Sequence, residues 1–168
     1  MATSCPACGC LREGGLRLTV CGDPACCCQE INARTSLERM AAEVSAAFQA
    51  RDLRAFGELL ADDARWGDDT ASNRCRSRSE VIDTFRRQLS AGVEGQVSAL
   101  EVGPAGILCQ LAFTSPAGGA GARPGTVFHL YRVRGGRIAE IEPFADRGPA
   151  LAALGAGRRG GRKPGKRS

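Results

Sequence analysis

The spacing of apolar side chains predicts three helices in the first half of the chain. From Ser36 onward, apolar residues recur every three or four positions, which is the period of a helix that buries one face. Asp52, a residue type that caps helices, precedes a second segment of this kind, and Ser77 with Glu80 forms a capping box that starts a third. The apolar positions of the three segments are Leu37, Met40, Val44 and Phe48, then Leu53, Phe56, Leu59 and Leu60, and finally Val81, Ile82, Phe85 and Leu89.

After Gly92 the apolar period changes to two, which is typical of strands with one buried face. The segments that alternate in this way are 96–102, 106–113, 126–134 and 137–144. Gly135 and Gly136 join the last two segments, because glycine accepts the positive φ of a tight hairpin turn. The Gly-rich residues 114–125 are expected to form a flexible loop between two strands. Helices followed by hairpin-linked strands predict an α+β domain, with the helices packed on one face of an antiparallel sheet.

Charge separates the end of the chain from the rest. Residues 1–155 hold 17 basic and 18 acidic side chains, whereas residues 156–168 hold six basic side chains and no acid. The domain is therefore not a basic nucleic-acid surface, and the tail is expected to be disordered, with at most nonspecific contact to a polyanion. No apolar run reaches the roughly 18–20 residues of a membrane span, and no signal peptide is visible. We expect a cytoplasmic protein without a membrane partner.

The first 33 residues form a cysteine-rich head, because seven of the nine cysteines lie within the first 28 positions. Without a secretory signal, such a cluster favours metal binding over disulfides. Cys5 and Cys8 have the spacing of a zinc knuckle, and Cys21 and Cys26 form a looser second pair after a short expected strand at 16–20. The head is either a structural zinc site with these four ligands or a disordered leader.

Several short motifs resemble, in their order and spacing, the SnoaL-like branch of the nuclear-transport-factor-2-like superfamily. They are 50–56 (ARDLRAF), 60–67 (LADDARWG), 75–81 (CRSRSEV), 133–138 (VRGGRI) and 144–147 (FADR). The resemblance implies one domain over residues 34–155, without a cofactor. In this fold, also called cystatin-like, three helices pack on a curved antiparallel sheet that forms a cone-shaped pocket. Members include steroid isomerases, polyketide cyclases, epoxide hydrolases, dehydratases and pockets with no known chemistry, so the fold alone does not choose a function.

The resemblance also implies two catalytic candidates. Asp68 lies at the offset after 61–64 (ADDA) where isomerase-like members carry a general base, and His129 falls near their oxyanion donor. The plainer alternatives are a polar loop for Asp68 and a hydrogen-bonded core residue for His129. Isomerases carry a tyrosine where this chain has Val44, so the steroid reaction itself is not expected. Aromatic residues that could line the pocket, or simply fill the core, are Trp66, Phe113, Phe128 and Tyr131.

Two functions from different classes remain open at this point. The first is a pocket that binds, or acts weakly on, a small hydrophobic molecule, with isomerase-, cyclase- or hydrolase-like proton transfer if it is an enzyme. The second is a noncatalytic module that dimerises through its sheet or docks on another protein. We expect a homodimer formed through the sheet. An open cavity shared by Asp68 and His129 favours the first function, whereas a cone filled by Phe and Leu favours the second.

Overall fold

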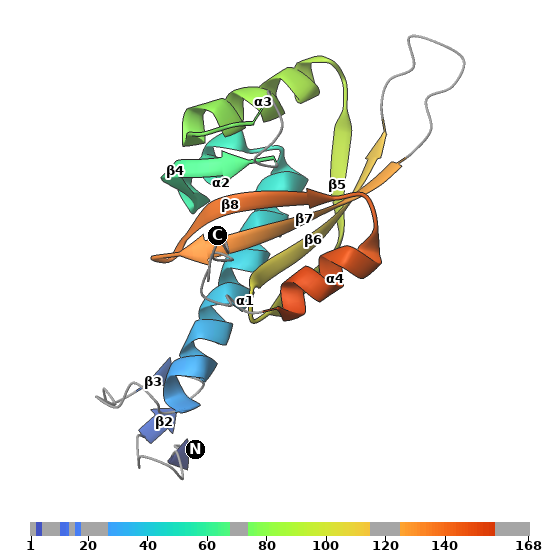
Figure 1. Cartoon of the computed structure of the whole chain (residues 1–168). Helices are drawn as coiled ribbons and strands as arrows, with labels where there is room; N and C mark the ends of the chain where they lie inside the picture. The colour runs from blue at the N-terminus through green and yellow to red at the C-terminus, as the bar shows by residue number, and fades with distance from the viewer. Residues whose placement is uncertain are drawn as a thin grey trace, which may run out of the picture.

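The protein structure is a computed structural model that describes residues 3–4, 11–13, 16–17, 27–67, 74–114 and 125–156. The expected zinc ligands Cys5, Cys8, Cys21 and Cys26, the candidate base Asp68 and the tail from residue 157 lie outside these ranges. The elements, in chain order, are β1 (Thr3–Ser4), β2 (Leu11–Glu13), β3 (Leu16–Arg17), α1 (Cys27–Ala50), α2 (Leu53–Leu59), β4 (Leu60–Trp66), α3 (Arg78–Ser90), β5 (Glu94–Gly103), β6 (Gly106–Thr114), β7 (Gly125–Arg134), β8 (Arg137–Phe144) and α4 (Arg147–Gly155) (Figure 1).

Five strands form the main sheet in the order β4-β8-β7-β6-β5. The strands from β5 to β8 are antiparallel neighbours, as predicted, but β4 pairs with β8 in parallel. The expected antiparallel sheet is therefore a mixed one, because β4 adds at the far edge of the last hairpin. Register shifts within the β5–β6 and β7–β8 pairs are irregularities of the kind that bend a sheet. The three short strands β1, β2 and β3 form a separate antiparallel sheet.

The helix boundaries follow the capping residues. Asp52 accepts hydrogen bonds from the backbone N–H groups of Arg54 and Ala55 at 3.0 and 2.9 Å and so caps α2. The Ser77 hydroxyl accepts from the Glu80 N–H at 3.3 Å at the start of α3. The first helix was expected to begin at Ser36, but α1 begins nine residues earlier, at Cys27.

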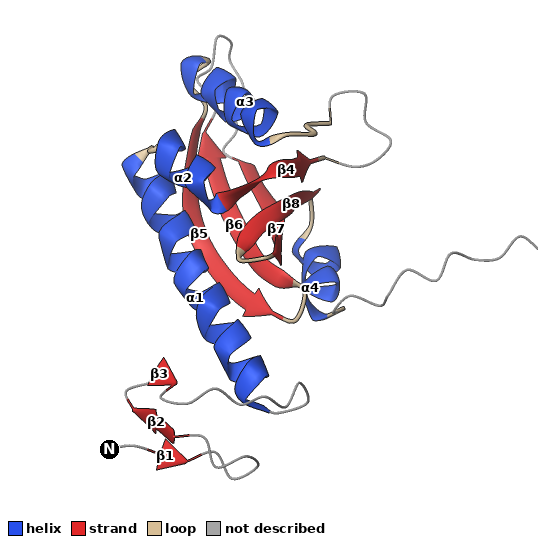
Figure 2. Cartoon of the chain, turned by 90° about the vertical axis from the view of Figure 1, so that its left-hand side faces the viewer, coloured by secondary structure: helices blue, strands red, loops and turns tan. Residues whose placement is uncertain are grey.

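Two hydrophobic clusters lie on the two faces of the sheet. The helices α1, α2 and α3 pack on the inner face, while α4 packs on the outer face (Figure 2). Alternation along β6 and β7 sends Ile107 and Tyr131 inward, and Leu108 and Leu130 outward. All four side chains are almost fully buried, and a buried aliphatic side chain contributes about 1.5–3 kcal/mol to folding. None of the described helices combines the length and apolar character needed to cross a bilayer.

Candidate functional site

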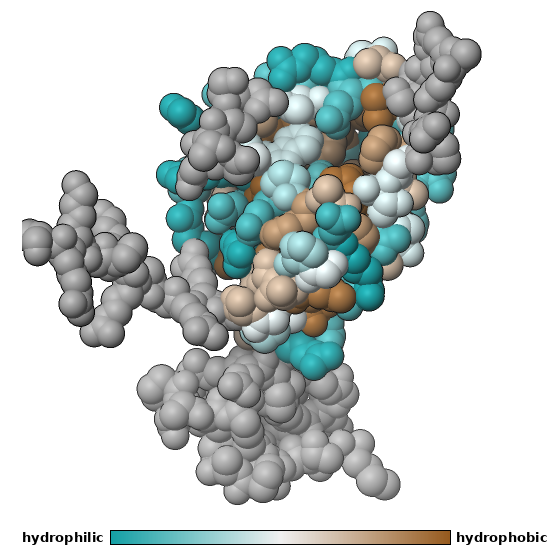
Figure 3. Space-filling model, turned by 45° about the vertical axis from the view of Figure 1, so that its right-hand side comes forward, coloured by the Kyte–Doolittle hydropathy of each residue, from teal (hydrophilic) through white to brown (hydrophobic). Residues whose placement is uncertain are grey.

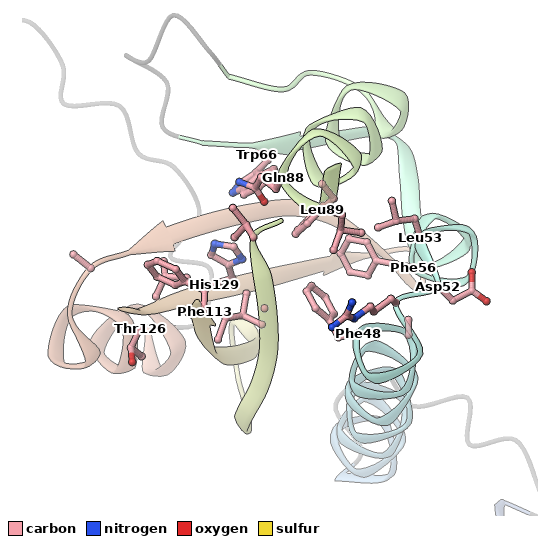
Figure 4. Close-up of a pocket in the computed structure, with 18 residues that line it drawn as sticks. Phe48, Asp52, Leu53, Phe56, Trp66, Gln88, Leu89, Phe113, Thr126 and His129 are labelled. Carbon is pink, nitrogen blue, oxygen red and sulfur yellow. The ribbon is translucent and has the colours of Figure 1, made fainter. Parts of the chain in front are cut away.

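An open cavity of about 620 Å³ lies between the inner face of the sheet and the helices α1, α2 and α3 (Figure 4). Its volume is within the range of about 300–1,000 Å³ that is usual for small-molecule sites. Its walls are mainly aromatic and aliphatic. The lining residues come from segments far apart in the sequence, from Ala47 on α1 to Ala145 after β8. The cone is therefore not filled by its own side chains.

Stacked aromatic rings form one wall of the cavity. The rings of Trp66 and Phe85 are nearly parallel, with centroids 4.7 Å apart. Phe48 and Phe56 meet Phe85 edge to face, at centroid distances of 5.7 and 5.2 Å. Trp66 is held in place because its backbone exchanges two hydrogen bonds, of 3.1 and 3.0 Å, with Cys75. This wall offers a flat, rigid surface to an apolar ring.

His129 lies in the floor of this cavity, on β7, among apolar neighbours. The residue is 5% exposed, and its ring meets Trp66 edge to face with centroids 5.5 Å apart. Burial lowers the pKa of His129 from 6.5 to about 4, so the imidazole is neutral at physiological pH. Its Nδ1 atom is buried and has no hydrogen-bond partner among the residues that the structure describes. A buried polar atom without a partner is costly, and a turn of the imidazole ring that brings Nδ1 to the cavity would let a bound molecule supply the missing bond.

The structure places the four aromatic candidates in three environments. Trp66 and Phe113 line the cavity beside His129. Tyr131 is fully buried in the inner cluster and is not part of the cavity surface. Phe128 lies on the outer face and packs in the cluster with α4, because neighbouring residues of a strand point to opposite faces. Residues 128 and 129 therefore cannot both face the cavity.

Two further buried groups, the Cys109 thiol and the Tyr131 phenol, do not ionise at physiological pH. Cys109 is paired across the strands with His129, and burial raises the pKa of its thiol to about 12. Burial, with Cys109 nearby, also raises the pKa of Tyr131 well above its ordinary value. Both side chains stay protonated at physiological pH. Val44 is fully buried in the same cluster and supplies no donor.

Three polar residues of the lining were missed by sequence reasoning: Arg51, Gln88 and Thr126. Arg51 lies in the turn between α1 and α2 with φ of +52°, and its Nη2 atom donates to Glu94 Oε1 at 2.7 Å. The sequence signal was the Arg-Asp pair between two helices, of which only the capping Asp52 was interpreted. Asp52 also borders the cavity, but its labelled carboxylate points away from it (Figure 4).

The described residues contain neither the candidate base Asp68 nor a group of side chains that could bind a metal. Asp68 follows Trp66 by two positions in the sequence and lies outside the described residues. Within residues 27–67, 74–114 and 125–156, no group of three His, Cys, Asp or Glu side chains could hold a metal ion. The described part of the cavity therefore presents one neutral imidazole, one guanidinium and the uncharged polar side chains of Gln88 and Thr126 on a largely apolar surface.

The fold is shared with several solved structures. Bal32a, from a soil-derived mobile gene cassette, matches with a TM-score of 0.57 and 16% identity over 72% of this chain and 97% of that one. An LEH-like epoxide hydrolase of M. tuberculosis matches with a TM-score of 0.53 and 20% identity over 73% and 91%. A candidate polyketide cyclase from Sinorhizobium meliloti matches with a TM-score of 0.51 and 20% identity over 65% and 98%. At these identities the likeness concerns the fold alone.

The family of the chain follows from a match to a family model and not from the structural similarities. No curated protein matches the sequence. The model of the SnoaL-like domain matches residues 41–141, which is more than half of the chain. This range includes α2, α3 and every strand of the main sheet except the end of β8, and it contains most of the cavity lining. The chain therefore belongs to the SnoaL-like domain family.

Proposed function

We propose that this protein binds a small, ring-bearing hydrophobic molecule in the cavity, with His129 hydrogen-bonded to a polar atom of that molecule. The observation that carries the proposal is the neutral imidazole in a mainly apolar floor, whose buried Nδ1 atom has no hydrogen-bond partner among the described residues. A ligand that bonds Nδ1 after the imidazole ring has turned over would remove the penalty of leaving this atom unpaired, and the ligand's own ring would bury apolar surface against Trp66 and Phe113.

If the bound molecule reacts, we expect a proton transfer next to a carbonyl. Asp68 would accept the proton, and the neutral N–H of His129 would donate a hydrogen bond to the developing enolate oxygen. With a pKa of about 4, His129 acts as a hydrogen-bond donor near pH 7 rather than as an imidazolium acid. Steroid isomerisation is not expected, because Val44 stands where the family's isomerases carry a tyrosine.

Binding can be tested with N-phenyl-1-naphthylamine, a neutral probe that fluoresces in apolar sites. We expect a saturable rise in probe emission at one site per chain, with parallel quenching of Trp66, the only tryptophan. Gly95 lies in the lining on the inner face of β5, and an added Cβ there meets nothing within 4 Å. Gly95→Phe should therefore fill the cavity and weaken binding by about tenfold or more, on the scale of a lost aromatic contact.

The matched control is Ala112→Phe, which adds the same side chain at an exposed position on the outer face of β6. This variant should bind the probe as the wild type does. Absence of saturable binding, or equal binding by Gly95→Phe and the wild type, would contradict the proposed pocket function.

Catalysis is tested separately by deuterium exchange next to the carbonyl of a cyclic ketone, followed by NMR. Asp68→Asn should lower the exchange rate by about 100-fold, on the scale of losing a general base, and His129→Gln should lower it less. Exchange that is unchanged in Asp68→Asn would leave a binding protein without this chemistry.

For the cysteine-rich head, we propose one structural zinc ion bound by Cys5, Cys8, Cys21 and Cys26. The knuckle spacing of the first pair supports it. Elemental analysis of protein purified under reducing conditions should find about one zinc per chain. A metal-free protein would favour the leader instead.

The alternative function, a noncatalytic module that dimerises, draws its support from the outer face. There, α4 carries the exposed or half-exposed residues Pro149, Leu151, Ala152 and Ala153. The surface view in Figure 3 shows tan and brown apolar areas between hydrophilic ones. A homodimer through this side of the sheet should become monomeric on Leu151→Asp in sedimentation experiments. The proposed contact of the basic tail with a polyanion is independent of either function.

A further inference from the structure

Arg51 places a permanent positive charge in the lining of the cavity. Among the described residues of the lining, Arg51 is the only Arg or Lys. His129, in the floor, is neutral because burial lowers its pKa to about 4. The carboxylate of Asp52, the neighbouring acid, accepts two backbone N–H bonds at the start of α2 and points away from the cavity (Figure 4). The guanidinium is thus the main charge available to a bound molecule.

The backbone of Arg51 is unusual for its side chain. Its φ of +52° is the left-handed conformation that glycine adopts readily and that a bulky residue disfavours. The turn itself is fixed by backbone bonds, from Arg51 N to Phe48 O at 3.1 Å and from Asp52 N to Ala47 O at 2.9 Å. Glycine would serve this turn at least as well. An arginine at this position therefore points to a use for its side chain.

The present partner of Arg51 holds it only weakly. Its Nη2 atom donates to Glu94 Oε1 at 2.7 Å, but the two side chains are 61% and 52% exposed. Exposed ion pairs of this kind contribute little to stability, and this contact uses one of the five guanidinium N–H donors. A ligand whose apolar body is already bound in the cavity would present its own charged group to Arg51 at high effective concentration.

We propose that Arg51 binds the anionic group of the ligand, which is therefore an amphipathic organic acid. Its apolar ring system lies against Trp66 and Phe113, and its carboxylate or other acidic group remains at the mouth, where it replaces Glu94 on the guanidinium. This inference rests on the proposed pocket function and adds the chemical class of the ligand to it.

Two probes that differ by one sulfonate test the inference. Wild-type protein and variants are titrated with 8-anilinonaphthalene-1-sulfonate and with neutral N-phenyl-1-naphthylamine. Arg51→Gln should weaken binding of the sulfonate about 5- to 10-fold, the loss expected for a charge-assisted contact at a partly exposed site, and change binding of the neutral probe less than about twofold. Glu94→Gln should strengthen binding of the sulfonate, because it removes the competing carboxylate.

Two further variants separate this role from structural and general electrostatic effects. Arg51→Gly should lose the preference for the sulfonate while melting at the same or a higher temperature, because glycine relieves the positive φ. Arg54→Gln removes an arginine that is 88% exposed and outside the lining, and should leave both affinities unchanged.

The outcomes distinguish the two proposals. If the wild type binds the neutral probe, but Arg51→Gln affects both probes equally or neither, the assignment of Arg51 is overturned and the pocket function stands. An equal loss of sulfonate binding in Arg54→Gln also overturns it. If neither probe binds the wild type, the pocket function fails and this inference fails with it.

Discussion

At the scale of single residues, burial decides the chemistry of His129. The same imidazole on the surface would titrate near 6.5, but desolvation in the cavity floor lowers its pKa to about 4. Its neutral form can offer one donor and one acceptor nitrogen to a ligand. The side chain is therefore suited to hydrogen bonding and unsuited to carrying charge at pH 7.

This shift predicts how stability depends on pH. The folded pKa lies below the unfolded value, so the unfolded chain binds more protons between about pH 6.5 and pH 4. The contribution of His129 to the unfolding free energy is therefore complete above pH 6.5 and is lost as the pH falls towards 4, by about 3 kcal/mol at most. Denaturant unfolding at several pH values measures it, and NMR of the single histidine gives its pKa directly.

His129→Gln is the control, because glutamine has no proton to gain in this range. The variant should lose that part of the pH dependence between pH 4 and 6.5. A titration midpoint near 6.5 in the folded protein, or an unchanged pH profile in the variant, would contradict the buried neutral imidazole.

At the scale of elements, the sequence predicted the strands best. The observed strands β5 to β8 start and end within two residues of the predicted ones, because alternation is regular there and glycines mark the turns. The helix α4 was missed, since its sequence (RGPALAALG) carries Gly and Pro near the start and small residues elsewhere. Its helical signal is the pair Ala150 and Leu154, whose importance depends on the sheet against which they pack.

The candidate site was predictable only in part, for a related reason. Alternation correctly put His129 on the same face as Val127, which lines the cavity. The same rule, applied to its neighbour, would have excluded Phe128. Arg51 could not be found in this way, because its place in the lining depends on the left-handed turn between two helices and on the distant Glu94. Local periodicity does not contain such long-range information.

The start of α3 offers a test of the predicted capping box. The Ser77 hydroxyl accepts from the Glu80 N–H, as predicted, while the Glu80 carboxylate accepts at 2.6 Å from the N–H of Arg76, the residue before the cap. Ser77→Ala should lower the unfolding free energy by about 1 kcal/mol, the usual cost of losing an N-cap. Ser90→Ala, at the exposed other end of α3, should change it by less than half as much. Equal effects of the two substitutions would show that the cap is unimportant.

At the scale of the whole molecule, the excess positive charge lies in the tail, outside the folded domain. The chain has a net charge of +5, but residues 1–155 alone have a net charge of −1. The observed domain ends with α4 at Gly155. Solution properties that depend on net charge therefore reflect the tail, whereas stability reflects the two clusters on either side of the sheet.

Removal of residues 157–168 tests this separation. The melting temperature should remain nearly unchanged, because these residues are mostly glycine and like charges with little to bury. The isoelectric point should move from about 8.9 to the acidic side, which verifies the change in charge. A fall of many degrees in melting temperature would show instead that the tail packs on the domain.

The parallel pairing of β4 with β8 also sets an order of events during folding. Leu60 pairs with Ile138, about 80 residues later, whereas the β7–β8 hairpin closes over two glycines. Contacts between distant parts of a chain form more slowly than local hairpins, since a longer loop must be closed first. The cavity needs both Trp66 at the end of β4 and His129 on β7. During synthesis, the cavity floor is therefore assembled only after the last hairpin has left the ribosome, and apolar surface that is exposed before then makes a nascent chain prone to aggregation.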